Sequence, residues 1–357
     1  MKIAFRTDAS AEIASGHFMR CVTLADELKK KGAKIRFLSK NLPLHLIKIL
    51  KQKGFEYVAL NICANIEEID DLAHSSWLGT SQAQDARATI EALADQRLWD
   101  WVIVDHYALD GRWETMVHAR TKRLMVIDDL ADRQHNCEIL LDQNFYLDMQ
   151  SRYIGKIPTQ CRLLSGPRYS LLREEFRTLR EEVKPHLGDI KRVLVFFGGV
   201  DGDDYTSLAI EALAELNSEL IVDVVIGIQH PNREKIKNAC FKYDYNLHIQ
   251  TKYIGYLMAE ADLAIGAGGS SSWERCCLGL PSLLVALAEH QIDIAKSLDY
   301  IGGCIYLGTK NAINSTSIKQ AIIRLLDNPG RTAALSRQAF SITDGFGAYR
   351  VSQELSY

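Results

Sequence analysis

The sequence predicts an α/β protein built from two doubly wound domains, and three observations point to this class. Short apolar runs typical of β-strands alternate with helical stretches along the 357 residues, a pattern that produces βαβ units and parallel sheets. The run at residues 193–197 is continuously apolar, as expected of a strand covered on both faces. The alternation also pauses at a polar stretch and restarts near residue 190, which predicts a second domain.

The strands and helices can be placed in order from these runs. In the first domain we expect strands at residues 2–6, 34–38, 56–59, 101–104, 123–127, 139–141 and 162–164. In the second we expect them at residues 192–197, 221–226, 247–250, 263–265, 282–285 and 304–307. The clearest helices cover residues 19–31 and 209–216, and helices at about 317–327 and 331–339 complete the second domain. We therefore predict an N-terminal domain at 1–165, a linker at 166–190 and a C-terminal domain at 191–357, whose last segment is a candidate for crossing back to the first domain.

Composition excludes several functional classes. The chain has 42 Lys and Arg against 45 Asp and Glu, which argues against a nucleic-acid partner. Its longest apolar stretches, such as residues 280–288, fall well short of the roughly 20 residues of a membrane span. The eight cysteines include no CxxC pair and no HExxH occurs, so we expect reduced thiols in a cytoplasmic protein and neither a metal nor a cofactor. The early charges at the N-terminus favour a first strand over a signal peptide, and the chain is compatible with a monomer.

The loop after the first predicted strand carries a candidate base. It runs from Asp8 to His17 and enters the first long helix. Gly16 would allow a sharp turn and place His17 at the helix N-terminus, where the helix dipole favours a neutral imidazole and an anionic ligand. A neutral histidine can act as a general base. The alternative interpretation is that His17 only caps or packs the helix.

A glycine- and serine-rich loop after the strand at 263–265 is the best candidate for a phosphate site. Gly268, Gly269, Ser270, Ser271 and Ser272 open a helix there, and such a loop can hold a diphosphate through N–H groups and hydroxyls without a metal. Glu274, in the first helical turn, could accept hydrogen bonds from ribose hydroxyls or could simply complement the helix dipole.

Further polar residues follow other strands. A second glycine loop at 198–204 ends in an acidic cluster that would repel phosphate, so we expect Asp203 to cap the next helix. Asp105, His106 and Tyr107 follow the strand at 101–104, and Asp128 and Asp129 follow the strand at 123–127. His290 and Gln291 follow the strand at 282–285 and should lie beside the Gly268 loop. These polar residues could equally cap turns and helices.

These loops together resemble a known family. The matching residues are 6–8 with 16–17 and Arg20, 104–107 with 113–114, 127–133, 141–144, 166–169, and 261–265 with 268–270 and 273–274. Across nearly the whole chain, they resemble the UDP-2,4-diacetamido-2,4,6-trideoxy-β-L-altropyranose hydrolases of pseudaminic acid synthesis. That family is related to GT-B glycosyltransferases, including the lipid-intermediate GlcNAc transferase of peptidoglycan synthesis.

The resemblance implies a GT-B-like fold, in which two Rossmann-type domains face an interdomain cleft, and a metal-independent hydrolase that releases UDP from a small-molecule UDP-sugar. His17 would activate water to attack the anomeric carbon with inversion. Residues 268–272 would hold the diphosphate, and Glu274 the ribose. We expect substrate contacts from Arg6, Asp8, Gly16, His106, Tyr107, His290 and Gln291. His290 stands where the family usually has asparagine, and a histidine lacks the paired donor and acceptor of that amide.

Other functions use the same features. A GT-B glycosyltransferase with a UDP-N-acetyl sugar donor would share the nucleotide site and would need an acceptor surface. Residues 42–53 could form one, although a packed helix with solvated lysines is the favoured interpretation of that stretch. A non-catalytic nucleotide-sugar sensor would not need His17. The hydrolase of the legionaminic acid route, which also epimerises its substrate and belongs to another family, ranks low.

Overall fold

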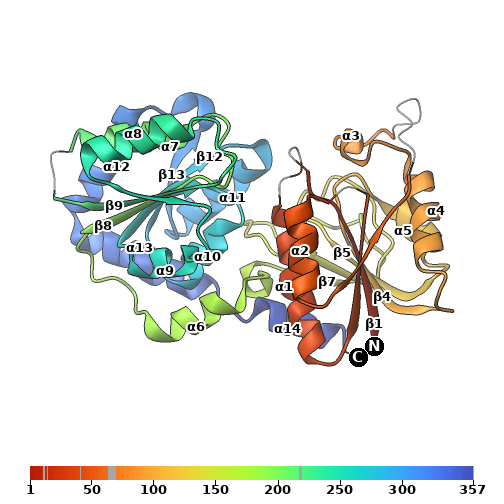
Figure 1. The fold of residues 1–357 in the computed structure, drawn as a ribbon. Coiled ribbons are helices and arrows are strands. Elements are labelled where there is room, and N and C mark those ends of the chain that lie inside the picture. The colour runs from red at the N-terminus through yellow and green to blue at the C-terminus, as the bar shows by residue number, and fades with distance from the viewer. Residues whose placement is uncertain (11–12, 14, 41, 63–69, 217–218, 357) are drawn as a thin grey trace. The chain divides into compact units, whose positions relative to one another are not determined.

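The computed structural model describes residues 1–10, 13, 15–40, 42–62, 70–216 and 219–356. The chain divides into two compact units (Figure 1). Unit 1 comprises Met1–Asn144, Asp148–Leu171 and Gly347–Tyr357, and unit 2 comprises Phe145–Leu147 and Leu172–Phe346.

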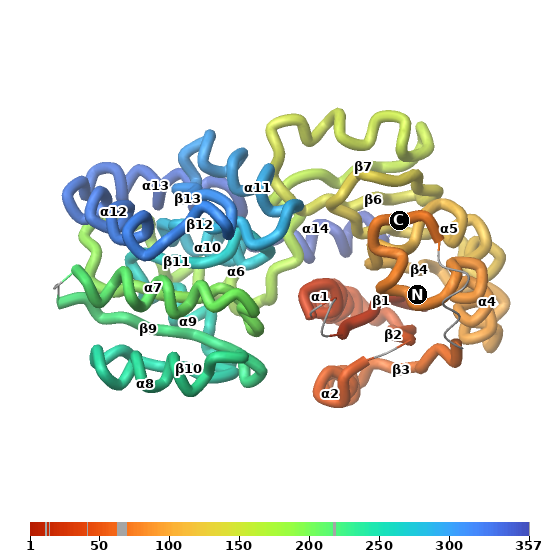
Figure 2. The backbone as a smooth tube through the Cα atoms, turned by 90° about the horizontal axis from the view of Figure 1, so that it is seen from above, coloured from red at the N-terminus to blue at the C-terminus, as the bar shows by residue number. Residues whose placement is uncertain are grey.

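Unit 1 is built on a seven-stranded sheet whose order is β3-β2-β1-β4-β5-β6-β7, and all its paired strands are parallel. Figure 2 shows these strands following one another across the unit. The chain winds outward from β1 to β3 and then returns to add β4 on the other side of β1. This reversal opens a switch point between β1 and β4, where ligands commonly bind at the carboxyl ends of the strands. The strands span Lys2–Thr7 (β1), Lys34–Ser39 (β2), Glu56–Ala59 (β3), Trp99–Asp105 (β4), Thr121–Ile127 (β5), Ile139–Asp142 (β6) and Arg162–Ser165 (β7).

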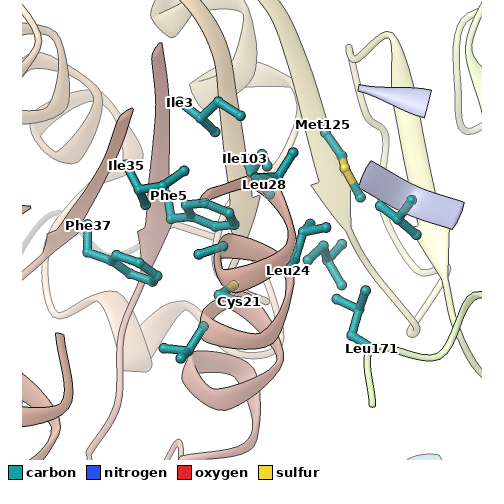
Figure 3. Packing of buried hydrophobic residues seen from close by; sticks show 14 of the residues in the cluster. Ile3, Phe5, Cys21, Leu24, Leu28, Ile35, Phe37, Ile103, Met125 and Leu171 are labelled. Carbon is teal, nitrogen blue, oxygen red and sulfur yellow. The ribbon is translucent and has the colours of Figure 1, made fainter. Parts of the chain in front are cut away.

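Helices cover both faces of this sheet because residues of the buried strands alternate between two apolar cores. One core joins Ile3 and Phe5 of β1 to helix α1, and Figure 3 shows Cys21, Leu24 and Leu28 of α1 against these strands. Helices α2 and α14 complete this core, while α4 and α5 belong to the core on the other face. The helices span Gly16–Lys30 (α1), Leu44–Gln52 (α2), Ser75–Leu78 (α3), Gln82–Ala92 (α4), Gly111–Val117 (α5) and Gly347–Glu354 (α14), with a 3₁₀ turn, η2, at Pro167–Tyr169.

Unit 2 repeats the same plan with a six-stranded parallel sheet of order β10-β9-β8-β11-β12-β13. Its switch point lies between β8 and β11. Helices α7, α8 and α12 pack on one face, and α9 and α10 lie on the other (Figure 1). The strands span Arg192–Phe196 (β8), Ile221–Ile226 (β9), Asn246–Ile249 (β10), Leu263–Ala267 (β11), Ser282–Ala286 (β12) and Ile305–Thr309 (β13). The helices span Glu174–Glu182 (α6), Tyr205–Ala214 (α7), Arg233–Tyr243 (α8), Ile254–Glu260 (α9), Ser271–Cys277 (α10), Glu289–Tyr300 (α11), Ser315–Leu326 (α12) and Pro329–Ile342 (α13), with a 3₁₀ turn, η3, at Lys310–Ala312.

Every strand predicted from the sequence is present, with bounds shifted by two residues at most. The predicted α/β class with two doubly wound sheets is confirmed. Among the residues with a described structure, no helix combines the length and apolarity of a membrane span. The described cysteines are free thiols, and Cys63 lies outside the described residues.

The domain bounds need correction at the C-terminus and in the predicted linker. Residues 347–357 group with unit 1 and not with the predicted C-terminal domain at 191–357. Apolar packing explains this grouping, because Val351 and Leu355 of the segment are buried in the core beneath α1. Trp101 Nε1 also donates a hydrogen bond to the Leu355 carbonyl at 3.0 Å. The stretch at 166–190 is no free linker, because its first residues belong to unit 1 and the rest, including α6, to unit 2.

Close backbone contact between α14 and η2 gives a first prediction. A Cβ on Gly347 would lie 2.1 Å from the Ser170 carbonyl oxygen, whereas one on Gly16 would meet no atom of the described residues within 4 Å. Gly347→Ala should therefore lower the free energy of unfolding by about 1–3 kcal/mol or more, because a backbone cannot yield as a side chain can. Urea denaturation would measure this, with Gly16→Ala as the control. Equal stability of the two variants would contradict the observed packing of α14.

Candidate functional site

The predicted base lies at the switch point of unit 1. Helix α1 begins at Gly16, so His17 occupies its first turn as expected. In the sheet, Thr7 at the end of β1 pairs with Asp105 at the end of β4, which brings the two loops together. Gly16 has no left-handed φ, so its backbone conformation is one that other residues can also adopt. Ala11, Glu12 and Ala14 of this loop lie outside the described residues.

A carboxylate holds the His17 ring. The Nδ1 atom of His17 lies 2.6 Å from Asp105 Oδ1. Arg20 Nη2 also approaches Nδ1, at 3.1 Å, but it donates at 2.7 Å to the same carboxylate oxygen. We therefore assign the Nδ1 proton to the bond with Asp105. This tautomer leaves the lone pair on Nε2, the atom that a general base needs.

Arg20 fixes this carboxylate from the other side. Its guanidinium contacts both oxygens of Asp105, with Nε donating to Oδ2 at 2.6 Å, and Nη1 donates to Asp129 Oδ2 at 3.0 Å. Burial alone would raise the pKa of Asp105, but the Arg20 guanidinium and His17 hold it well below its usual range. Asp105 is therefore ionised and can stabilise a protonated His17.

Aromatic rings surround His17. The Tyr107 ring meets His17 edge-on, with centroids 4.5 Å apart, and its hydroxyl donates to Asp129. Trp77 stacks on Tyr107 at 5.6 Å, and His74 packs against both rings. Tyr107 therefore lies beside His17, at the same edge of the sheet, whereas Trp77 and His74 were not anticipated because they come from α3 and the turn before it.

Three other predicted substrate contacts form a buried ionic network. Arg6 is fully buried and pairs with Asp8 at 2.8 Å and with Asp85 at 2.6 Å. Asp8 also accepts hydrogen bonds from Ser39 Oγ and the Lys40 N–H, and His106 Nε2 lies 3.3 Å from it. Because these contacts engage the Arg6 guanidinium inside the unit, Arg6 is suited to positioning Asp8 rather than to touching a ligand.

A second buried network supports the segment after β5. Asp128 pairs with Arg133 at 2.8 Å, and His135 lies 2.7 Å from Glu114 Oε1 and 3.7 Å from Asp128 Oδ2. Burial alone would lower the pKa of His135, but the two carboxylates outweigh it and raise the pKa to about 9. His135 is therefore a cation at neutral pH and helps to hold Asp128, the neighbour of Asp129, in place.

The predicted phosphate loop lies at the switch point of unit 2, between β11 and α10. Some of its N–H groups and hydroxyls form hydrogen bonds within the unit, and others lie at the surface. The Gly268 N–H donates to the Val285 carbonyl at 3.0 Å, and the Ser272 N–H donates to the Gly269 carbonyl at 2.9 Å. The Ser272 side chain is buried, and its Oγ accepts a hydrogen bond from Arg275. Ser270 is exposed, and it makes no capping bond with its side chain. The part of the loop suited to a ligand is therefore Gly269, Ser270 and Ser271.

Glu274 and Gln291 flank this loop. Glu274 is in the first turn of α10, and its Oε1 lies 3.4 Å from Arg173 Nη2. Burial raises the pKa of Glu274, while Arg173 and Arg275 oppose that shift. The Gln291 Nε2 atom would lie 3.6 Å from a Cβ on Gly269, so Gln291 adjoins the loop as predicted. His290 is exposed at the start of α11.

The acidic loop after β8 acts mainly as a helix cap. Asp204, rather than the predicted Asp203, is the N-cap of α7 and accepts the Ser207 N–H. Asp201 accepts the N–H groups of Tyr205 and Thr206. In the part of the chain that is described, Asp201, Asp204 and His230 form a possible metal-ligand group, with ligand atoms within 4.8 Å of one another. Their capping bonds explain the positions of both carboxylates without an ion.

Arg275 and Arg173 were missed by the sequence reasoning. Both lie next to residues that were predicted, and no local pattern distinguishes them from surface arginines. Asp105 was noted only as a polar residue after a strand and Arg20 only as part of a family pattern, because the ion pair between them joins positions 85 residues apart.

Comparisons with known proteins bear on the fold and on the family resemblance. Residues 192–354 match the glycosyltransferase family 28 C-terminal domain. Over its full length the chain superposes on MurG of Acinetobacter baumannii with a TM-score of 0.67, 14% identity and 99% coverage of that chain. The GT-B fold implied by the family resemblance is therefore confirmed.

Three curated relatives extend the comparison. The chain is 26% identical to the UDP-2,4-diacetamido-2,4,6-trideoxy-β-L-altropyranose hydrolase of Campylobacter jejuni, over 84% of this chain and 96% of the relative. This match confirms the resemblance described above. The chain is 23% identical to an uncharacterized protein of Methanocaldococcus jannaschii over 84% of this chain, and 28% identical to a spore coat polysaccharide biosynthesis protein of Bacillus subtilis over 58% of this chain. These matches span only 58% and 61% of the two relatives' own lengths.

The raised pKa of His135 predicts a pH-dependent stability. A cation whose pKa is raised from 6.5 to about 9 on folding stabilises the fold fully below pH 6.5 and loses that effect as the pH rises through 9. The difference corresponds to about 3 kcal/mol. Urea denaturation near pH 6 and near pH 9.5 should therefore show a steeper loss for the wild type than for His135→Gln.

The control for this experiment is His118→Gln in the same unit, because His118 is half-buried, contacts the Asn136 carbonyl and forms no ion pair with a carboxylate of the described residues. This variant should keep the pH dependence of the wild type. A pH dependence that persists unchanged in His135→Gln would rule out the ionic role of His135.

Proposed function

We propose that this chain is a metal-independent hydrolase that releases UDP from UDP-2,4-diacetamido-2,4,6-trideoxy-β-L-altropyranose and yields the free sugar for pseudaminic acid synthesis. The observation that carries the proposal is the contact of 2.6 Å between His17 Nδ1 and Asp105, in the first turn of α1. This pairing leaves Nε2 able to take a proton from water. The choice of sugar rests on the similarity to the Campylobacter jejuni protein named above.

In the proposed reaction, water loses a proton to His17 Nε2 as its oxygen attacks the anomeric carbon. The bond between that carbon and the β-phosphate oxygen breaks, UDP departs with both bonding electrons, and the configuration inverts. Asp105 stabilises the imidazolium that forms and keeps its ring oriented. Arg20 holds Asp105 in turn, so the base needs little reorganisation during the reaction.

The leaving group requires stabilisation of its growing negative charge. We assign this to the backbone N–H groups and hydroxyls of Gly269, Ser270 and Ser271, since donors placed in advance are effective at such a point. Glu274 would accept hydrogen bonds from the ribose. Gln291, which adjoins Gly269, and the exposed His290 would contact the phosphate or the sugar.

The remaining predicted contacts take different roles in this proposal. Tyr107 and the rings beside it form an apolar wall next to His17, which suits the apolar face of a deoxy sugar. Gly16 precedes the proposed base, and a Cβ at this position would meet no atom of the described residues within 4 Å. Asp8 and His106 are buried near the end of β1, and with Arg6 they would shape the site from behind.

A GT-B glycosyltransferase that uses a UDP-N-acetyl sugar donor is the second candidate. The observation in its favour is the match of residues 192–354 to the glycosyltransferase family 28 domain. The stretch considered as an acceptor surface forms α2, where Leu46 and Leu50 are buried in the core and Leu44 is exposed. This pattern is typical of a packed amphipathic helix, and it weakens the case for an acceptor surface there.

Removal of the proposed base should separate catalysis from nucleotide binding. His17→Ala should lower kcat by about 10²–10⁴-fold because the general base is lost, while the affinity for UDP stays close to that of the wild type. Stopped assays of UDP release and calorimetric titration with UDP would measure the two quantities. His45→Ala changes an exposed histidine on α2 and serves as the control. Turnover that survives in His17→Ala would refute the assignment.

The products of a reaction without acceptor should distinguish the two candidates. When the protein is incubated with the UDP-diacetamido sugar alone, we expect UDP and free sugar in equal amounts, with inverted configuration at the anomeric carbon by NMR. A transferase would release UDP only after an acceptor is added. A nucleotide-sugar sensor would bind without any turnover.

A further inference from the structure

One buried cation in unit 2 lies directly under the proposed phosphate loop. Arg275, on α10, is 2% exposed. Its Nη2 donates to the Ala267 carbonyl at 2.7 Å and to Ser272 Oγ at 3.0 Å, and its Nη1 donates to Ser271 Oγ at 3.3 Å. The guanidinium therefore binds the loop from its inner side, at both ends of the turn between β11 and α10.

This guanidinium lacks the partner that other buried arginines have. Arg6, Arg20 and Arg133 each pair with carboxylates at 3.0 Å or less. Among the ion pairs of the described residues, none involves Arg275, and its buried Nε has no hydrogen-bond partner there. Burial lowers the pKa of Arg275, and nearby groups such as Glu274 offset this only in part. A buried charge without a counterion is costly, and proteins seldom keep one without a use.

The neighbouring backbone leaves room for this arrangement. A Cβ on Gly266 would lie 2.2 Å from the Phe196 carbonyl oxygen and 3.1 Å from Arg275 Nη1. Glycine at 266 therefore lets β11 lie close to β8 and leaves space for the guanidinium. On the outer side, Ser270 is exposed and Gly269 and Ser271 are half-buried. A ligand on this outer side would meet the loop donors, with the positive charge of Arg275 directly behind them.

We propose that Arg275 is a positioning residue that supplies the buried counter-charge for a diphosphate bound on the outer side of Gly269, Ser270 and Ser271. The inference rests on the proposed function, because it takes the nucleotide diphosphate as the ligand. Arg275 acts through the loop and does not touch the ligand. It orients Ser271 and Ala267. Its positive charge lowers the electrostatic free energy of the negatively charged phosphates on the outer side of the loop. The same charge would favour the departure of UDP as the glycosidic bond breaks.

Ligands that differ only in phosphate content test the inference. Binding of UDP, UMP and uridine would be measured by calorimetry for the wild type, Arg275→Gln, Arg275→Met and Arg275→Lys. We expect both neutral variants to lose about tenfold or more in UDP affinity, to lose less for UMP and to bind uridine as the wild type does. Arg275→Lys should retain much of the UDP affinity. Arg331→Gln changes an exposed arginine of α13 and should match the wild type.

Thermal unfolding without ligand separates this role from a structural one. Removal of the unpaired buried charge should offset the loss of the hydrogen bonds that Arg275 donates to Ala267, Ser271 and Ser272, so Tm should change little, while the increase in Tm caused by UDP should shrink. A purely structural role predicts a lower Tm and an equal loss for uridine and UDP. That result, or failure of both neutral variants to fold, would overturn the inference.

The two proposals fail in different ways. Unchanged UDP affinity in the neutral variants, with UDP binding intact in the wild type, would overturn the role of Arg275 alone. A wild-type protein that does not bind UDP at all would overturn both this inference and the proposed function.

Discussion

The ion pair between Arg20 and Asp105 is the contact on which the organisation of unit 1 depends. It joins α1 to the end of β4, and through Asp129 it also joins the segment after β5. Three elements that are distant in sequence thus meet at the carboxyl edge of the sheet. A bidentate pair buried in this way fixes direction as well as distance, so the carboxylate that holds His17 has little freedom. The orientation of the imidazole is therefore a property of the fold and does not require a bound substrate.

The two units arrange their charges in opposite ways. In unit 1, the buried arginines Arg6, Arg20 and Arg133 are each paired with aspartates. The result is a rigid site in which each of these positive charges is neutralised. In unit 2, Arg275 donates its hydrogen bonds to a carbonyl and two serine hydroxyls, which carry no negative charge. The first arrangement suits a base that must keep one tautomer. The second suits an anion that brings its own negative charge.

Elements could be predicted from the sequence far better than contacts. Apolar strands such as β8 and β9 can be recognised from their own short stretch of sequence, so their positions were predicted to within a residue. Their parallel pairing follows from the alternation with helices, and with it the convergence of His17 and Asp105 at one edge. The packing of α14 on unit 1 depends on Val351 and Leu355 meeting a core whose α1 residues lie more than 300 positions earlier in the chain. The roles of Ser272 and Arg275 depend on which side of a turn each side chain takes, and glycine and serine content does not determine this.

The proposed role of Arg275 would explain how a chain with a near-neutral charge balance can bind a diphosphate. With 42 basic and 45 acidic residues, the chain has no surplus of lysines with which to attract a diphosphate. A surface lysine acts through water, whereas a guanidinium inside the protein acts through an effective dielectric constant about fourfold lower, so its attraction for an anion at the same distance is correspondingly stronger. One buried arginine behind a loop of N–H groups can therefore replace a cluster of surface cations. Because such a residue barely alters composition, a near-neutral sequence is compatible with a site that binds two phosphates.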